Sequence, residues 1–317
     1  MKVPCLLIAF SRAEGISRLL SSLDSSKVSK IYLAIDGPKT SSTKLSQTAI
    51  RQIVREFASS KDLPIEIWSR EENLGVAKAI ISALDWFYSC EEFGIILEDD
   101  LTVGSDFLDF ISRNRTLLEC DDRILLISGN QFDLHHQVYS SRNWTNYPLI
   151  WGWATTHAKW KVIRDGILSS EISFWTKPFN RIENFWRVGA LRVRSGEVDT
   201  WDIPFAYFMR KTETICLMPS ENLVTNHGND QFAAHTNSGR FPLNLASEKL
   251  LELNVVTKPD RKDIHNYNRF LEQVVFGIRA KHSLLLLVYY FSLVLGKKKN
   301  WNQLKDDLES VKYPKLS

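Results

Sequence analysis

The stretch "GIILEDDLTV", from Gly94 to Val103, decides how this chain is interpreted. Its first half is a short apolar run of the kind that forms a buried strand. Three consecutive carboxylates follow, Glu98, Asp99 and Asp100. Two like charges about 5 Å apart repel by roughly 3 kcal/mol at an effective dielectric constant of about 20. Three carboxylates at the end of a buried strand therefore need an explanation.

The residues leave three explanations open. The carboxylates could be solvated in a surface turn. They could cap the next helix, because Ser105 and Asp106 open a helical pattern. They could also hold a divalent cation, which would remove the repulsion between them. The rest of the chain has to decide between these readings.

The composition excludes several classes of protein. The chain has 317 residues, a net charge of only +3 and 44% hydrophobic residues, which predicts a sizeable core and gives no sign of nucleic-acid binding. Its cysteines are scattered without a CxxC pair, which argues against a zinc site or a disulfide framework and fits a reducing compartment. The apolar run near the N-terminus is interrupted too early for a signal peptide and predicts a strand.

Strand and helix patterns alternate along the first half of the chain. Apolar runs predict five strands, and amphipathic stretches predict helices between them, including one over 43–59 and one that begins after Asn73 as its N-cap. The predicted strands are "VPCLLIAFSR", "KIYLAIDGP", "LPIEIWS", "GIILEDD" and "RILLISGN". This alternation predicts an α/β fold with a mostly parallel sheet and helices on both faces.

Polar residues stand at the carboxyl ends of four of these strands. Open α/β sheets bind ligands outside that edge, so these side chains are expected to converge. They are Phe10 to Arg12, Asp36 and Gly37, Arg70 to Asn73, and Glu98 to Asp100. The convergence of these residues at one edge of the sheet favours the cation-binding explanation for the acidic triplet.

The motifs in this order resemble a known family. "AIDGP", "NLGVAKA", "LEDD", "GWATTHAKW", the "WD" of "DTWDIPFAYF" and "NLVTNHGNDQFAAHT" are similar to motifs of GT-A nucleotide-diphosphosugar glycosyltransferases. The likeness is to the inverting family 2-type enzymes and to the N-acetylglucosaminyltransferase I group, whose acidic motif is also EDD. It covers roughly residues 3 to 240. The resemblance implies a GT-A (Rossmann-like) fold and transfer of a sugar from a nucleotide-diphosphosugar, with a UDP-sugar as the expected donor.

The resemblance implies roles for the acidic triplet. Asp100 would bind Mn²⁺ or Mg²⁺ directly, Asp99 would contact the metal or the ribose, and Glu98 would support them from behind. Such a cation offsets the negative charge that grows on the leaving diphosphate. His235, in "AAHT", would be a further metal ligand, and an imidazole ligand favours Mn²⁺ over Mg²⁺.

The resemblance also implies residues that contact the nucleotide. Asp36 would hydrogen-bond the base, and Phe10, Arg12, Asn73 and Lys78 would lie on the nucleotide side. Each has a simpler explanation that stays open. Asp36 could be only a turn residue, and Asn73 only a helix cap. Arg12 and Lys78 could be only solvated surface charges.

Two further motifs supply the sugar and acceptor side. Gly152 and Trp153 would line the donor sugar or the acceptor, because sugars stack on aromatic faces, although the tryptophans of this motif could equally fill the core. An inverting displacement needs a carboxylate to remove the acceptor proton. The "WD" motif assigns that role to Asp202. Asp199 is the reserve, and either residue could instead cap a helix.

The chain after residue 240 departs from the family pattern. We expect a catalytic domain over 1–240 and a helical C-terminal extension over 241–317. The apolar segment 283–296 is shorter than the ~20 residues of a spanning helix. It fits either a buried helix or an interfacial helix on an anionic leaflet. The expected location is cytoplasmic, with peripheral contact at the inner face of the membrane as a further hypothesis.

The leading interpretation is a metal-dependent, inverting hexosyl- or N-acetylhexosaminyltransferase of polysaccharide biosynthesis, acting on a glycan or lipid-linked acceptor. Three alternatives remain. A sugar-1-phosphate nucleotidyltransferase would need a Gly-rich, Arg-containing loop after the first strand, which "AFSRAEG" lacks. A non-catalytic glycan- or nucleotide-binding subunit would not need the intact acidic triplet. A metal-dependent nuclease would need further carboxylate clusters.

Overall fold

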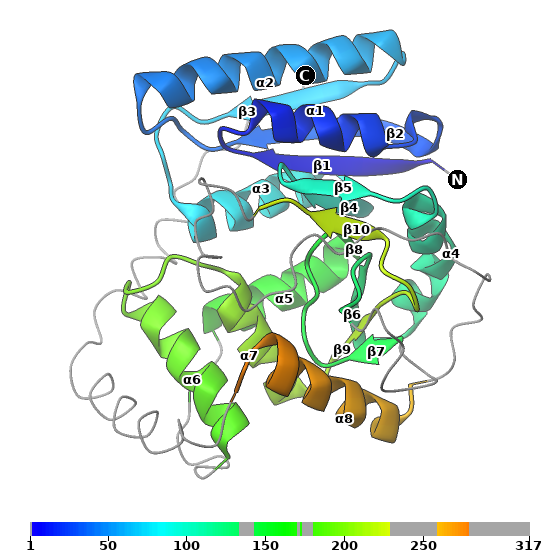
Figure 1. The fold of residues 1–317 in the computed structure, drawn as a ribbon, viewed down its shortest axis with the longest axis vertical. Coiled ribbons are helices and arrows are strands. Elements are labelled where there is room, and N and C mark those ends of the chain that lie inside the picture. Colours follow the sequence, from blue (N-terminus) through cyan, green and yellow to red (C-terminus); the bar gives the residue numbers. More distant parts are fainter. Residues whose placement is uncertain (1, 133–142, 170–171, 173–179, 229–258, 279–317) are drawn as a thin grey trace.

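The computed structural model describes residues 2–132, 143–169, 172, 180–228 and 259–278 (Figure 1). An eight-stranded sheet with the strand order β3-β2-β1-β4-β8-β6-β9-β7 runs through this part of the chain. Its strands are β1 (Val3–Ala9), β2 (Val28–Ile35), β3 (Ile65–Ser69), β4 (Phe93–Glu98), β6 (Ile124–Ser128), β7 (Trp144–Thr145), β8 (Trp153–Thr156) and β9 (Ile215–Leu217). A separate two-stranded sheet pairs β5 (Leu101–Val103) with β10 (Val224–Asn226).

The large sheet is mostly parallel. β1 pairs in parallel with both β2 and β4, β2 with β3, and β6 with β9. β8 lies antiparallel between β4 and β6, and β7 is antiparallel to β9. Because β8 is antiparallel to both of its neighbours, β6 and β9 point the same way as β1 to β4. Within this sheet, β7 and β8 run in the opposite direction.

Helices cover both faces of this sheet (Figure 1). One buried cluster packs beneath α1, α2 and α4, and β1 contributes Leu7 to it. The opposite cluster packs beneath α3, α5 and α7, and β1 contributes Leu6. Strands buried on both faces read as continuous apolar runs, as "CLLIA" does. The helices are α1 (Ala13–Ser22), α2 (Ser41–Ser60), α3 (Val76–Cys90), α4 (Phe107–Cys120), α5 (His157–Ser169), α6 (Arg181–Arg194) and α7 (Asp202–Thr212), with a 3₁₀ turn η1 (Ser25–Lys27).

The predicted fold class is confirmed: the protein is an α/β protein with a mostly parallel sheet and helices on both faces. The five predicted strands are all present as β1, β2, β3, β4 and β6. The helix predicted over 43–59 runs from Ser41 to Ser60, and the hydroxyl of Thr40 caps it by accepting from the N–H of Thr43. The short strand β5, directly after the acidic triplet, was not foreseen.

The described end of the chain is helical. α8 (Arg261–Phe270) continues into the π-helix η2 (Leu271–Val275). Tyr267 and Asn268 of α8 hydrogen-bond Gln131 and Thr145, so this helix is tied to the sheet domain. Within the described residues, no helix has both the length and the apolar character needed to cross a membrane. The segment 283–296 lies outside the described residues, and its predicted membrane contact and the domain boundary at residue 240 stay predictions.

Candidate active site

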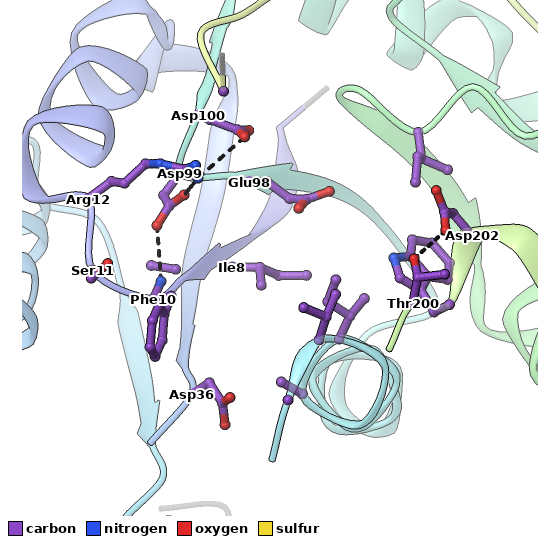
Figure 2. A pocket seen from close by; sticks show the side chains of 18 of the residues that line it. Ile8, Phe10, Ser11, Arg12, Asp36, Glu98, Asp99, Asp100, Thr200 and Asp202 are labelled. Atoms are coloured by element: carbon purple, nitrogen blue, oxygen red, sulfur yellow. Dashed lines mark hydrogen bonds and ion pairs between the residues drawn. The ribbon is translucent and has the colours of Figure 1, made fainter. Parts of the chain in front are cut away.

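The site lies where the strand order of the sheet reverses. β1 has β2 on one side and β4 on the other, with Ile8 of β1 beside Glu98 of β4. Ligands of open α/β sheets bind at the carboxyl ends of strands at such a switch point. A pocket of about 440 Å³ occupies this position (Figure 2). Most residues predicted for the site line it together: Phe10, Arg12, Asp36, Asn73, Glu98, Asp99, Asp100 and Asp202.

The acidic triplet is neither a solvated surface turn nor a helix cap. Asp99 is only 5% exposed, and its carboxylate accepts from the Phe10 N–H at 3.0 Å and from Arg12 Nη1 at 3.1 Å (Figure 2). Arg12 Nη1 also lies 3.4 Å from Asp100 Oδ2. The residues that follow form β5 rather than a helix. One guanidinium therefore holds two of the three carboxylates.

Negative charge from neighbouring carboxylates still surrounds Glu98. Its side chain is half-buried and has no hydrogen-bond partner in the described part of the chain. Burial, and then the neighbouring carboxylates of Asp100, Asp99 and Asp202, raise the pKa of Glu98 to about 8. Burial also raises the pKa of Asp99, against the opposing effect of Arg12. Arg12 alone does not balance the charge at this strand end.

The donor set suits a hard divalent cation. Glu98 and Asp100 present carboxylate oxygens to the pocket, the ligand type that Mg²⁺ and similar ions take. The described residues hold no cluster of three or more His, Cys, Asp or Glu side chains that could bind a metal. His235, the predicted further ligand, lies outside the described residues. The metal site and its assignment to Asp100 therefore stay predictions.

The pairing of β5 with β10 brings a distant segment against the triplet. The N–H of His227 donates to the carbonyl oxygen of Asp100 at 2.7 Å. A Cβ built on Gly228 would lie 2.5 Å from Asp100 Oδ2, so only glycine fits there without a shift. Asn226 and Gly228 line the pocket as a result. The sequence motif around them was recognised, but its predicted functional residue was His235.

Asp36 binds a loop rather than standing free at the end of β2. It is 8% exposed, and its carboxylate accepts from Asn73 Nδ2 at 2.8 Å and from the N–H of Leu74 at 3.0 Å. Burial raises the pKa of Asp36, opposed by the hydrogen bond from Leu74. The prediction that Asn73 caps the following helix is wrong. α3 begins at Val76, and the side chain of Asn73 turns back to Asp36 and to the Gly37 carbonyl.

The cap of α3 is Asp199. Its two carboxylate oxygens accept from the N–H groups of Val76 at 2.7 Å and Ala77 at 3.0 Å. The N-cap position itself is Gly75, with φ at +81°, and a Cβ there would lie 2.3 Å from Asp199 Oδ2. Glycine is needed on both counts. The reserve candidate for the base is thus committed to a helix terminus.

Asp202 is placed differently, at the first residue of α7 and in the pocket wall. Its Oδ1 accepts from the Thr200 hydroxyl and from the Ile203 N–H (Figure 2). Its Oδ2 has no hydrogen-bond partner within the described residues. The Thr200 contact fixes the carboxylate and leaves one oxygen for a ligand. Sequence reasoning missed Thr200, although it stands only two residues from the recognised "WD" motif.

Three predicted residues are not brought to the pocket lining. Trp153 is 1% exposed and stacks on Trp201 inside the core. Gly152, with φ at +61°, is buried where a Cβ would lie 2.9 Å from Val224. Lys78 lies on α3 beside the lining residues without joining them. Trp151 lines the pocket instead, half-buried.

No family model matches this chain, and no curated protein matches it. Several solved structures are similar to parts of this chain at low identity. The crystal structure of S. aureus TarS 1-349 is 13% identical over 72% of this chain and 61% of its own, with a TM-score of 0.40. The structure of UDP-glucose pyrophosphorylase complexed with UDP-glucose is 8% identical over 69% of this chain and 91% of its own, with a TM-score of 0.39.

A third structure is glucosyl-3-phosphoglycerate synthase from Mycobacterium tuberculosis in complex with Mn²⁺, UDP and phosphoglyceric acid. It is 11% identical over 50% of this chain and 56% of its own, with a TM-score of 0.31. The chain therefore spans less than two thirds of the length of TarS 1-349 and of this synthase. At these identities and TM-scores the comparisons assign neither a family nor an activity.

Proposed function

We propose that the protein is an inverting glycosyltransferase that uses a nucleotide-diphosphosugar, with a UDP-sugar as the expected donor. One observation carries the proposal. Asp202, whose Oδ2 has no hydrogen-bond partner among the described residues, lines the same pocket as the charged cluster at the ends of β1 and β4 (Figure 2). A base and a charged leaving-group site in one pocket are what such a transfer needs.

The nucleotide side of the pocket would be formed by β1, β2 and the loop before α3. Phe10 offers an aromatic face, with Lys39 Nζ 5.7 Å from its ring centroid. Asp36 and Asn73 hold each other beside it, where they can meet the polar edge of a base. Arg12 lies against Asp99 and Asp100 of the acidic triplet, and Lys78 is on α3. The proposed contacts follow the sequence resemblance.

The diphosphate would lie at the ends of β1 and β4. Asp100 and Glu98 would hold a divalent cation there, Mn²⁺ or Mg²⁺, and Asp99 would keep Arg12 in place. When bound, the cation would offset the negative charge that develops on the leaving diphosphate. Removing this charge balance should cost most of the donor affinity.

The proposed reaction is a single displacement. Asp202 takes the proton of the acceptor hydroxyl while its oxygen attacks the anomeric carbon of the donor. The bond from that carbon to the diphosphate oxygen breaks, and the nucleoside diphosphate leaves with the electron pair. The new glycosidic bond forms on the face opposite the leaving group, which inverts the anomeric configuration. Thr200 keeps the base oriented throughout.

The test combines binding and turnover. The purified chain is titrated with UDP by calorimetry, in Mn²⁺ and again in EDTA, and then incubated with a panel of UDP-sugars while UDP release is measured. We expect UDP to bind in Mn²⁺ and one donor to release UDP. Binding without release from any donor would favour the alternative of a non-catalytic nucleotide-binding subunit. Absence of UDP binding at millimolar concentration contradicts the proposal.

A further inference from the structure

A second pocket, of about 470 Å³, adjoins the first at Asp202. The two pockets share Ile150, Trp151, Thr200 and Asp202 as lining residues. The proposed base therefore borders both cavities. An attacking group bound in the second pocket would lie within reach of Asp202.

The lining of this second pocket, here called the aromatic pocket, is unlike that of the first. The first presents carboxylates, Arg12 and Lys39. The second is lined mainly by rings and aliphatic groups from the loop between β7 and β8, from α6 and α7, and from the end of η2. The rings belong to Phe132, Tyr147, Trp151, Phe185, Trp186 and Phe276. Such a surface favours an apolar ligand body.

The polar atoms of two of these rings are already engaged. The Tyr147 hydroxyl donates to Glu272 Oε1 at 2.8 Å, and Trp186 Nε1 donates to that hydroxyl oxygen at 3.2 Å. Arg210 Nη1 bonds the same Glu272 oxygen at 3.0 Å, which neutralises it. Tyr147, at 0% exposure, and Trp186, at 6%, therefore form a fixed, apolar back wall of the pocket. Their orientation is fixed before any ligand binds, so little side-chain entropy remains to be lost.

Asn130 adds one buried donor to the pocket wall. It is 1% exposed, and its Nδ2 has no hydrogen-bond partner among the described residues. Its Oδ1 accepts from the Ser128 hydroxyl at 3.1 Å and from the Trp151 N–H at 3.3 Å, which identifies the oxygen end of the amide. Buried donors are normally paired, so this one points to a ligand acceptor atom.

Among the residues that the structure describes, the polar groups lining the aromatic pocket are too few for a sugar ring. Asn130, Thr200 and Asp202 stand at the wall, while Arg192 is paired with Glu197 at 3.6 Å. A hexose brings several hydroxyls, and each one buried without a partner costs about 1–3 kcal/mol. An aryl or alkyl body with one hydroxyl would meet no such cost.

We propose that the aromatic pocket binds the acceptor, and that the acceptor's body beside its reacting hydroxyl is aryl or alkyl rather than a polyhydroxylated sugar. The inference rests on the proposed function in so far as Asp202 is the base that receives the hydroxyl proton. The ring cluster holds the apolar body. Asn130 Nδ2 donates a hydrogen bond to an oxygen or nitrogen atom of the same ligand.

The test separates this inference from the proposed function because it measures binding without turnover. Saturation-transfer NMR on the full chain is run with 2-phenylethanol and, in parallel, with glucose. We expect transfer to 2-phenylethanol and none to glucose at equal concentration, with no competition from UDP and Mn²⁺. Binding of 2-phenylethanol with no UDP binding would sink the proposed function alone, whereas preferential binding of glucose would overturn the inference alone.

Two variants with opposite effects on the pocket locate the binding. Phe185→Ala removes a half-buried ring, and Val198→Trp fills the pocket from a half-buried loop position. Each should weaken 2-phenylethanol binding at least fivefold while leaving UDP binding within twofold. Phe57→Ala is the matched control, since this half-buried ring packs on the opposite side of the sheet. Unchanged 2-phenylethanol binding in both pocket variants overturns the proposal.

Discussion

The carboxylate of Asp199 accepts a 2.7 Å hydrogen bond from the backbone N–H of Val76, which starts α3. This contact separates two aspartates that the sequence presents as near equals. Asp199 is committed to a helix N-terminus, where a negative charge is favourable. Asp202, three residues later, lines the pocket, and its Oδ2 has no hydrogen-bond partner among the described residues. The two residues should therefore respond differently to substitution.

Asp199→Ala should lower stability more than it lowers chemistry. Loss of an N-cap costs about 0.5–2 kcal/mol, which lowers the melting temperature by a few degrees in a chain of this size. Asp199→Asn should retain part of the cap, so its melting temperature should lie between those of wild type and Asp199→Ala. Thermal unfolding followed by circular dichroism checks this order. A melting temperature equal to wild type together with abolished turnover would instead make Asp199 the base.

Asp202→Asn should leave donor binding intact and remove transfer. An amide cannot accept the acceptor proton, and general-base catalysis contributes about 10²–10⁴-fold. We expect UDP affinity within twofold of wild type and a loss of at least 100-fold in turnover, measured as UDP release. Thr200→Val, which removes the hydroxyl that orients Asp202, should reduce turnover by less. Full activity of Asp202→Asn would move the base elsewhere.

Arg12→Met should destabilise the protein and weaken UDP binding together. The change leaves Asp99, which is 5% exposed, without its guanidinium partner. Removing one member of a buried pair costs about 3–5 kcal/mol, and the partial exposure of Arg12 places the expected effect at or below the lower end. Arg18→Met on the exposed face of α1 is the matched control. Equal unfolding temperatures for the two variants would show that the pair contributes nothing.

Glu98→Gln should stabilise the metal-free protein at high pH. The folded pKa of Glu98 is raised to about 8 by burial and by its acidic neighbours, against an ordinary value of 4.5. The stability that this carboxyl contributes is full below pH 4.5 and is lost as the pH rises through 8. In EDTA, the variant should match wild type near pH 5 and melt about 3 °C or more above it at pH 9.

The control for this prediction is Glu14→Gln, an exposed carboxyl in the first turn of α1. It should show no comparable gain between pH 5 and pH 9. A constant difference between Glu98→Gln and wild type across that range would mean that the Glu98 carboxyl does not change ionisation there. Adding Mn²⁺ at pH 9 should reduce the gain, since a bound cation stabilises the ionised carboxylate.

The sequence was sufficient for five strands, β1 to β4 and β6, and for most of the charged pocket wall, but not for β5 or for β7 to β10. Apolar runs such as "CLLIA" are read directly, and parallel strands carry their terminal residues to one edge, so Arg12, Asp36 and Asp100 could be grouped without coordinates. The residue that caps α3 could not be identified from the sequence. A local rule assigns it to Asn73, whereas Asp199 supplies it from a distant loop, and nothing in the sequence between them signals that contact.

The tryptophans show a second limit of sequence reasoning. In "WGW", both rings are compatible with a sugar-binding surface, and strand alternation alone would place residues two apart on the same face. The structure places Trp153 in β8, which lies between two strands and is covered on both faces, while Trp151 precedes the strand and lines the two pockets. Which ring is accessible depends on the packing of Trp201 and Phe205 over β8, a tertiary effect.

The antiparallel pairing of β5 with β10 has a consequence for biosynthesis. It closes the charged pocket with Asn226 and Gly228, more than a hundred positions downstream of the acidic triplet. During translation, the nascent polypeptide must therefore expose its triplet, its arginine and its loops at the exit tunnel well before the final wall has emerged. A ribosome-stalled intermediate ending at residue 220 should consequently be unable to retain UDP, however completely its early strands have folded.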